Sequence, residues 1–277
     1  MEKNKRITIM VASKDRHSEI ALLIQSLRTQ TYQGWDLVIL DECQTPIEVC
    51  DYLAKLLNRI RLENHCVKVF KNEVSLGVCN ARNMLIKLDY FNNPYVARLD
   101  DDVILESDYL KRLVDVIEIN GYDIASGVTP LLGSPDVIRN ADEIGFVINE
   151  KEIDQEGNIV KHGDDCGYTY NKSKIFPTHE FRSNALMKKE VLDAGVRYPT
   201  NLSPVGFREE AFFSFSAQYK GFKIGVDTSA VAYHLVTPSG GCRFIDYADK
   251  VQSDDKYFRK WVKEKFESEG LPWKNLK

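Results

Sequence analysis

The sequence lacks several features that would define other classes of protein. No run of apolar residues approaches membrane-spanning length, and the apolar run after the charged N-terminal residues is too short for a signal sequence. The six cysteines are scattered without CxxC spacing, which argues against a zinc site or a disulfide framework. The chain also has no internal repeat and no low-complexity tract. We therefore expect a cytoplasmic protein with reduced thiols and no transmembrane segment.

The composition is that of a globular protein with a sizeable core. The chain has 277 residues, of which 43% are hydrophobic and 28% charged, so it can form one large domain or two small ones. The formal net charge of -4 argues against a general nucleic-acid binder.

Strand-like and helix-like patterns alternate along the first hundred residues. Short β-branched runs predict strands at residues 6–12, 36–40, 67–70 and 95–99. Helical periodicity predicts helices around residues 20–27, 53–60 and 78–88, the second opened by a capping box at 45–48. This alternation predicts a parallel sheet with helices on its faces.

The second half of the chain has a weaker pattern. A helix capped by Ser107 is expected, and the stretch from 129 to about 180 is predicted to be a variable insertion that faces the substrate, with a hairpin at 146–160. Further helices are predicted at 185–194, 209–220 and 246–266, and further strands at 122–128, 222–226 and 230–233.

Three consecutive carboxylates follow the strand predicted at residues 95–99. Like charges side by side repel and are costly to bury, so packing alone does not explain Asp100, Asp101 and Asp102. Ligand sites in parallel sheets lie at the carboxyl ends of strands, where Mg²⁺ or Mn²⁺ can bind carboxylate and phosphate oxygens together. The run predicts a metal–diphosphate site, although a solvated turn would have the same sequence. On an extended chain Asp100 and Asp102 share a face, and Asp101 is expected to point away.

Several motifs stand in the order that is typical of glycosyltransferase family 2, the inverting GT-A enzymes. The chain from about residue 6 to 235 resembles this family in Gln30-Thr31-Tyr32, Asp41-Glu42, the Asn72…Gly77…Ala81-Arg82-Asn83 segment, Leu99-Asp100-Asp101-Asp102, Arg208-Glu209-Glu210 with Gly221-Phe222, and Tyr233-His234. It departs from the family in the first turn, Ala12–Arg16, which lacks a proline and a tyrosine, and after Asp41-Glu42, where a glycine is missing. Each motif is weak by itself, and their common order makes the resemblance strong.

The resemblance implies a fold, a domain organisation and a reaction. The fold would be GT-A, an α/β fold with a mostly parallel central sheet flanked by helices and a C-terminal helical tail at 246–277. Residues 1–245 would form the glycosyltransferase domain, with a nucleotide-binding half at 1–105 and an acceptor-binding half at 106–245. The reaction would be a hexosyltransferase-type transfer, with inversion, from a nucleoside-diphosphate sugar, UDP-sugar being commonest, to an acceptor hydroxyl. Mn²⁺ or Mg²⁺ would be the cofactor.

The resemblance also assigns roles to single residues. Asp102 would bind the metal, and His234 would complete its shell. Asp100 would face the ribose or assist the metal. The residues expected to contact the nucleotide are Ser13, Asp15, Asp41, Asn72, Arg82, Asp100 and Asp101. Structural alternatives stay open for three of these residues: a hydrogen-bonded strand-end histidine at 234, a turn aspartate at 41 and a surface arginine at 82.

Inversion by direct displacement needs a general base that takes the proton of the acceptor hydroxyl. Glu209 and Glu210 begin a predicted helix, and Glu210 matches the position of the family's base, which is usually aspartate. Glu209 would then hold the acceptor or serve as the base itself. Plain helix capping is the alternative, because helix N-termini favour carboxylates.

Two other functions remain possible from the sequence. A nucleotidyltransferase would need a glycine-rich phosphate loop after the first strand, and Ser13–Arg16 has no glycine. A catalytically silent nucleotide- or sugar-binding protein would not need both acids at 209 and 210. The sequence leaves the donor sugar, its base and the acceptor open, with a glycan as the expected acceptor. It also leaves open a homo-oligomer formed through the C-terminal helix, and it predicts that the glycine-containing segment 237–241 is a lid that orders over the donor.

Overall fold

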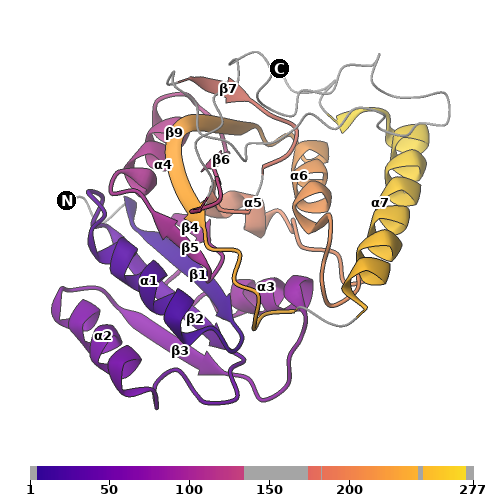
Figure 1. Ribbon diagram of the computed structural model, residues 1–277. Helices are drawn as coiled ribbons and strands as arrows, with labels where there is room; N and C mark the ends of the chain where they lie inside the picture. Colours follow the sequence, from indigo (N-terminus) through magenta and orange to yellow (C-terminus); the bar gives the residue numbers. More distant parts are fainter. Residues whose placement is uncertain (1–4, 134–173, 182, 243–245, 273–277) are drawn as a thin grey trace.

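The computed structural model describes residues 5–133, 174–181, 183–242 and 246–272 (Figure 1). The strands β1 (Ile7–Ser13), β2 (Trp35–Asp41), β3 (Val67–Lys71) and β4 (Tyr95–Arg98) lie side by side in the order β3-β2-β1-β4 and pair in parallel. This half of the sheet confirms the predicted alternation of strands and helices.

The sheet continues beyond β4 with mixed pairing. Strand β8 (Ala185–Lys188) pairs antiparallel with both β4 and β6 (Ile124–Val128), and β6 pairs in parallel with β9 (Ile224–His234). Two short strands, β5 (Val103–Leu105) and β7 (Ile175–Pro177), are antiparallel to β9. The sheet is therefore mostly parallel, as predicted, with antiparallel strands inserted in its second half.

Helices cover both faces of the sheet. The helices of the N-terminal half are α1 (His17–Arg28), α2 (Asp51–Leu62), α3 (Val78–Lys87) and α4 (Tyr109–Glu118). Those of the C-terminal half are α5 (Lys189–Asp193), α6 (Glu209–Tyr219) and α7 (Tyr247–Glu269). Among the described residues, none of these helices is both long and apolar enough to cross a membrane.

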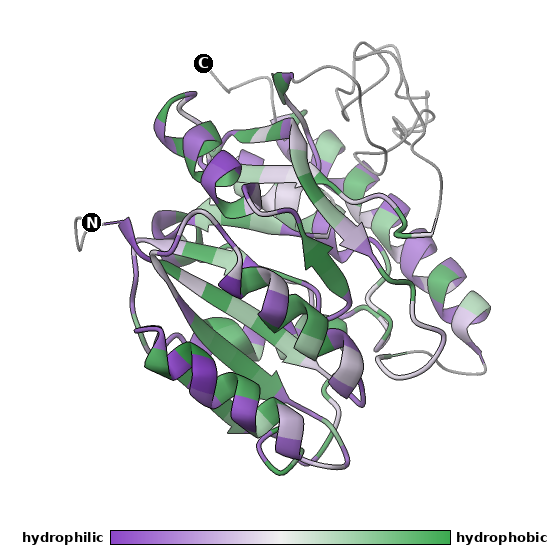
Figure 2. Ribbon diagram, turned by 60° about the vertical axis from the view of Figure 1, so that its left-hand side comes forward, coloured by the Kyte–Doolittle hydropathy of each residue, from purple (hydrophilic) through white to green (hydrophobic). Residues whose placement is uncertain are grey.

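The side chains of β1 alternate between two cores, because successive residues of a strand point to opposite faces. Ile7, Ile9 and Val11 pack in a core with the buried faces of α1, α2 and α4. Met10 points to the opposite face and packs in a second core with residues of α3, α5 and α6. Figure 2 shows the same division, with green strands between helices whose outer faces are purple. The sheet is thus covered on both faces, and its strand ends are left to form a site.

Helix α7 lies outside α6 and packs against it through a separate aromatic cluster (Figure 1). Phe212 and Phe215 of α6 contact Phe258 and Trp261 of α7, with ring centroids 4.7 to 6.5 Å apart. The aromatic face of the C-terminal helix is therefore used inside the chain.

Some predicted elements differ from the structure. Residues 185–188 are a strand and not the first turn of a helix, because they fill the gap in the sheet between β4 and β6. Helix α2 begins at Asp51, after a turn at 47–49, so Thr45–Glu48 is not its capping box. Helix α4 has Asp108 and not Ser107 at its N-cap, and the two last predicted strands are one strand, β9. The hairpin predicted at 146–160 lies outside the described residues.

Candidate functional site

A cavity of about 320 Å³ opens where β1 and β4 end. Ser13, Lys14 and Arg16 reach it from the end of β1 and the loop that follows, and residues 98–102 reach it from the end of β4. Helix α3 contributes Arg82. Other lining residues are Glu209 at the start of α6, His234 at the end of β9, Tyr247 at the start of α7, and Glu42 and Gly241 in loops. Carboxyl ends of parallel strands are the usual ligand sites of such sheets, and the size suits a small molecule.

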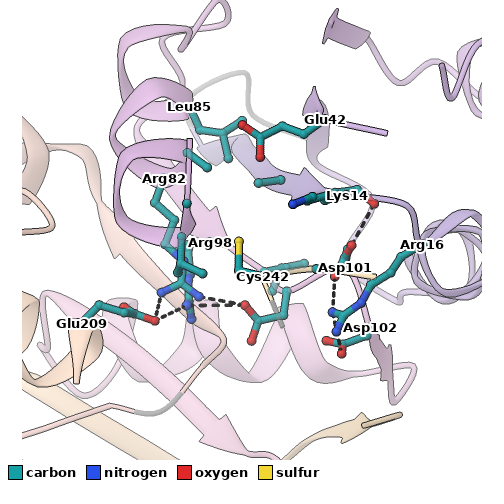
Figure 3. A pocket seen from close by; sticks show the side chains of 18 of the residues that line it. Lys14, Arg16, Glu42, Arg82, Leu85, Arg98, Asp101, Asp102, Glu209 and Cys242 are labelled. Carbon is teal, nitrogen blue, oxygen red and sulfur yellow. Dashed lines mark hydrogen bonds and ion pairs between the residues drawn. The ribbon is translucent and has the colours of Figure 1, made fainter. Parts of the chain in front are cut away.

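The structure brings most of the predicted site residues to this cavity. Those that line it are Ser13, Arg82, Asp100, Asp101, Asp102, Glu209 and His234. Figure 3 shows Arg82, Arg98 and Glu209 on one side of the cavity and Arg16, Asp101 and Asp102 on the other. The predicted residues that are not among its lining residues are Asp15, Asp41, Asn72 and Glu210.

Arg16 binds two of the three consecutive carboxylates. Its Nη1 lies 2.9 Å from Asp101 Oδ1 and 2.8 Å from Asp102 Oδ2, and all three side chains are at most 10% exposed. Ser13 Oγ donates a hydrogen bond of 2.8 Å to Asp101 Oδ2. Burial raises the pKa of the Asp101 carboxyl to about 7, and Arg16 opposes this shift. One guanidinium group thus compensates a buried pair of acids.

The expectation that Asp101 points away from its neighbours is wrong. Residues 101 and 102 form a turn between β4 and β5, so the alternation of an extended chain does not apply to them. Asp101 and Asp102 consequently face the same guanidinium group, whereas Asp100 is bound by Arg82 at 3.0 Å.

His234 stands beside Asp102 because of the strand register. β5 pairs with the end of β9, so that Val103 lies opposite His234. The imidazole Nε2 is 3.2 Å from Asp102 Oδ2, and this hydrogen bond raises the pKa of His234. An imidazole nitrogen and a carboxylate oxygen from distant parts of the chain therefore meet at one point of the cavity wall.

The opposite wall is a network of two arginines and three carboxylates. Arg98 Nη2 lies 3.0 Å from Glu209 Oε1, 3.0 Å from Glu210 Oε1 and 3.4 Å from Asp100 Oδ1. Arg82 also forms ion pairs with Asp100 and Glu209. Burial alone would lower the pKa of Arg98, but the carboxylate neighbours, Asp100 first, raise it above its ordinary value. Two cations thus hold three acids of this network in fixed positions.

The two glutamates differ in exposure. The side chain of Glu209 is 4% exposed, and its Oε2 is buried without a hydrogen-bond partner. The side chain of Glu210 is 21% exposed. Glu209 is therefore the buried acid, with one oxygen that lacks a hydrogen-bond partner, whereas solvent reaches Glu210.

Three predicted nucleotide contacts serve the loops around the cavity in this structure. Asp41 is 1% exposed, and its two oxygens accept the backbone N–H groups of Cys43 and Ile47, each at 2.9 Å. Asp15 Oδ1 accepts from Gln44 N at 2.7 Å. Asn72 Nδ2 donates to Glu42 Oε1 at 3.1 Å. Glu42 itself lines the cavity. Asp15, Asp41 and Asn72 therefore support the loops around Glu42.

Sequence reasoning missed Arg16 and Arg98. Arg16 lies in the first turn and Arg98 in a predicted strand, and sequence patterns alone assign a role to neither. The available signal for Arg98 is its charge within a predicted buried strand, two residues before Asp100. A side chain that is 5% exposed needs a partner of opposite charge, and here those partners are Asp100 and the two glutamates that begin α6.

The segment after His234 is docked against the first loop. Gly241 N donates to Lys14 O at 2.8 Å, and Arg16 Nε donates to Ser239 O at 3.3 Å. Gly240 has φ of +73°, and a Cβ there would lie 2.8 Å from Asp15 O and 2.9 Å from Lys14 O. Only glycine permits this backbone conformation and this approach together. Whether the segment orders further over a donor remains a prediction.

Comparison with known proteins identifies the family. A family model described as Glycosyl transferase family 2 matches residues 8–192, more than half of the chain. The chain therefore belongs to glycosyltransferase family 2. A curated protein of Haemophilus influenzae, described as an uncharacterized glycosyltransferase, is 26% identical over 129 residues, which cover 46% of this chain and 37% of that protein. The match thus spans little more than a third of this relative's length.

Solved structures show the same fold. The structure of S. aureus TarS 1–349 in complex with UDP-GlcNAc matches with a TM-score of 0.60 and 14% identity, over 95% of this chain and 73% of that chain. The mannosyltransferase PcManGT from Pyrobaculum calidifontis, in complex with GDP-Man and Mn²⁺, matches with a TM-score of 0.59 and 12% identity, over 97% of this chain and 71% of that chain. At these identities the likeness establishes the GT-A fold, which confirms the predicted fold class.

Proposed function

We propose that this protein transfers a sugar, with inversion, from a nucleoside-diphosphate sugar to the hydroxyl group of an acceptor. The observation that carries the proposal is the meeting of two groups of side chains in one cavity. Asp102 and His234 stand on one wall, and Glu209, supported by Arg82 and Arg98, stands on the other. A donor needs the first group for its diphosphate and the second for its sugar and the acceptor.

The donor set at Asp102 fits a divalent cation that also binds phosphate. The wall offers a carboxylate oxygen and an imidazole nitrogen 3.2 Å apart, with Asp101 adjacent. Among the described residues, no group of three His, Cys, Asp or Glu side chains is arranged to hold a metal by itself. Mg²⁺ commonly binds one or two carboxylates and takes further ligands from substrate phosphates and water. We therefore expect Mn²⁺ or Mg²⁺ to bind tightly only together with the diphosphate.

Each protein group has a separate task in this reaction. A divalent cation held by Asp102 and His234 would supply Lewis-acid neutralisation of the charge that develops on the leaving diphosphate. Arg82 adds a fixed positive charge on the wall of the cavity. Glu209 Oε2, which is buried without a partner, suits a hydroxyl of the donor sugar. Glu210, the more exposed acid, would take the proton of the acceptor hydroxyl.

Nucleotide binding tests the metal side of the site. UDP and GDP should each be added with and without Mn²⁺ while the melting temperature is followed. A nucleotide at one hundred times its Kd stabilises the native state by about 2.7 kcal/mol, on the order of 5 °C in Tm. We expect this rise only with Mn²⁺ in the wild type and not in Asp102→Asn. Equal Mn²⁺-dependent stabilisation in both proteins would contradict the role of Asp102. The nucleotide that gives the larger rise identifies the base, for which uridine is our first expectation.

Turnover tests the acid pair. Glu209→Gln and Glu210→Gln keep the size of the side chain but cannot accept a proton. Loss of a general base typically reduces turnover by about 100- to 10,000-fold, and nucleotide affinity should stay within about twofold, because the diphosphate contacts lie elsewhere. The exposed Glu267→Gln on α7 is the matched control and should be unaffected. If Glu209→Gln alone loses turnover, the base is Glu209. If neither variant loses it, the pair only begins a helix and the mechanism is wrong.

A further inference from the structure

A buried carboxylate of α7 holds the loop that leads into the acid pair. Asp254 is 2% exposed, although it belongs to a helix of mostly polar composition. Its Oδ1 accepts a hydrogen bond from Ser203 N at 2.7 Å. Its Oδ2 accepts from Ser203 Oγ at 2.8 Å and from Phe207 N at 2.9 Å. A buried carboxylate is costly unless such donors satisfy it, so both ends of the loop 203–207 are tied to α7.

The same loop is tied to α3 on its other side. Val78 N, at the start of α3, donates to Pro204 O at 3.0 Å. A Cβ on Gly77 would lie 2.8 Å from Pro204 Cα, so the two backbones are in direct contact. Helix α3 carries Arg82, and Val205 of the loop lines the cavity. The loop is therefore a bridge between α7 and the wall of the site.

The residue that joins this loop to α6 is held in an unusual conformation. Arg208 has φ of +71°, the left-handed region that non-glycine residues rarely adopt. Its Nε donates to Asp255 Oδ1 at 2.9 Å, and its guanidinium group lies over the ring of Phe258, 5.9 Å from the centroid. Both partners belong to α7. Such a conformation persists only where the surroundings fix it, so α7 also determines the direction in which α6 begins.

We propose that Asp254 is a positioning residue for the reaction. By fixing the loop 203–207, it sets the direction from which the chain enters α6, and so where Glu209 and Glu210 stand relative to Arg98 and the cavity. Helix α7 is then a part of the catalytic apparatus and not an appended tail. The catalytic consequence of this inference rests on the proposed function, but the hold on the loop can be measured without any turnover.

Asp254→Asn is the sharpest test, because it keeps the shape of the side chain. An amide nitrogen replaces one acceptor oxygen, so one of the backbone donors of the loop is left without a partner. We expect faster hydrogen exchange in residues 203–210, with Kd for UDP plus Mn²⁺ unchanged within about twofold. A displacement of about 1 Å in a catalytic group can cost on the order of 100-fold in rate. Release of UDP from UDP-glucose and UDP-N-acetylglucosamine, or of GDP from GDP-mannose, should therefore fall between 10- and 100-fold for whichever donor the wild type cleaves.

A double-mutant cycle separates positioning from general loss of stability. If Asp254 acts through Glu210, Asp254→Asn should change turnover little in the Glu210→Gln background, because the group it positions is already inactive. The exposed Glu267→Gln also replaces a carboxylate with an amide, near the opposite end of the same helix, and should alter neither hydrogen exchange nor turnover. Ser203→Ala removes a single hydrogen bond to Asp254 and supplies a milder variant if Asp254→Asn does not fold.

The outcomes distinguish this inference from the proposed function. The role of Asp254 would be overturned if Asp254→Asn left hydrogen exchange at 203–210 unchanged. It would also be overturned if the rate losses of Asp254→Asn and Glu210→Gln multiplied in the double mutant. The proposed function would stand in both cases. Faster exchange together with a Glu210→Gln variant of normal turnover would overturn the proposed base, and the catalytic role of Asp254 would fall with it. Faster exchange, a lower turnover number and non-additive rates together would support the inference.

Discussion

Substitution of Arg16 is a sharp test of the site, because its guanidinium group compensates two buried acids. Its Nη1 lies 2.9 Å from Asp101 and 2.8 Å from Asp102, with all three side chains nearly buried. This cation lies against the carboxylate that is proposed to bind the metal. A metal ion and Arg16 would therefore compete for the same negative charge. We predict that Arg16→Met, which keeps the aliphatic stem, weakens the fold without metal and raises the affinity for metal.

The structure sets the size of both effects. Two unit charges about 4 Å apart interact by about 4 kcal/mol at the effective dielectric constant of about 20 that suits such sites. Removal of one partner of a buried ion pair typically costs about 3–5 kcal/mol, because the other charge is left uncompensated. At about 2–4 °C per kcal/mol, Tm should fall on the order of 10 °C. A bound cation would compensate the acids that Arg16→Met leaves unpaired. If it recovers a third of the lost energy of about 3–5 kcal/mol, the affinity for Mn²⁺ without nucleotide rises about tenfold.

Mn²⁺ titration followed by calorimetry, together with melting curves, measures both quantities. Arg112→Met is the matched control, because Arg112 also lies between two carboxylates, Asp108 at 2.6 Å and Asp227 at 3.6 Å, away from the cavity. It should leave the affinity for Mn²⁺ unchanged. A folded Arg16→Met protein with equal or weaker Mn²⁺ affinity would refute the competition. Arg16 would then be a partner of the metal site, and we would assign it to the diphosphate.

Three further predictions concern the scaffold. Gly127→Ala would place a Cβ 2.0 Å from Ala230 O, so its free energy of unfolding in urea should fall by about 3 kcal/mol or more, whereas Gly133→Ala, with no atom within 4 Å, should be neutral. Gly240→Ala, at φ of +73°, should speed hydrogen exchange at 237–241, and UDP plus Mn²⁺ should slow exchange there in the wild type. Burial lowers the pKa of His179 to about 4, below its ordinary value of about 6.5. As the pH falls, the unfolded state therefore binds a proton at a higher pH than the folded state does. The free energy of unfolding should fall by about 3 kcal/mol between pH 6.5 and pH 4. An unfolding curve of equal pH dependence in His179→Gln would contradict this assignment.

Local sequence patterns are sufficient to predict the layers of the fold and the motifs at the strand ends. The strands β1 to β4 and the helices between them follow from local patterns, because periods of 2 and 3.6 are local properties of the chain, although α2 begins later than its expected capping box. The carboxylates at 100–102 were predicted to stand at a strand end because a charged run directly after an apolar one is visible in the sequence. Order along the chain was also sufficient to recognise the family.

Local patterns do not predict which of these side chains face one another. The sequence of β8 has a helical pattern. It forms a strand because it pairs with β4 on one side and with β6 on the other, and local sequence patterns do not predict this pairing. Arg16 meets Asp102, and Asp254 meets Ser203, across separations of many residues. Such pairs follow from the sheet order and from where each loop ends. A charged residue at a buried position predicts that a partner of opposite charge exists. The identity of that partner depends on the fold, because the energy of a charge pair depends on distance in space and not on separation along the chain.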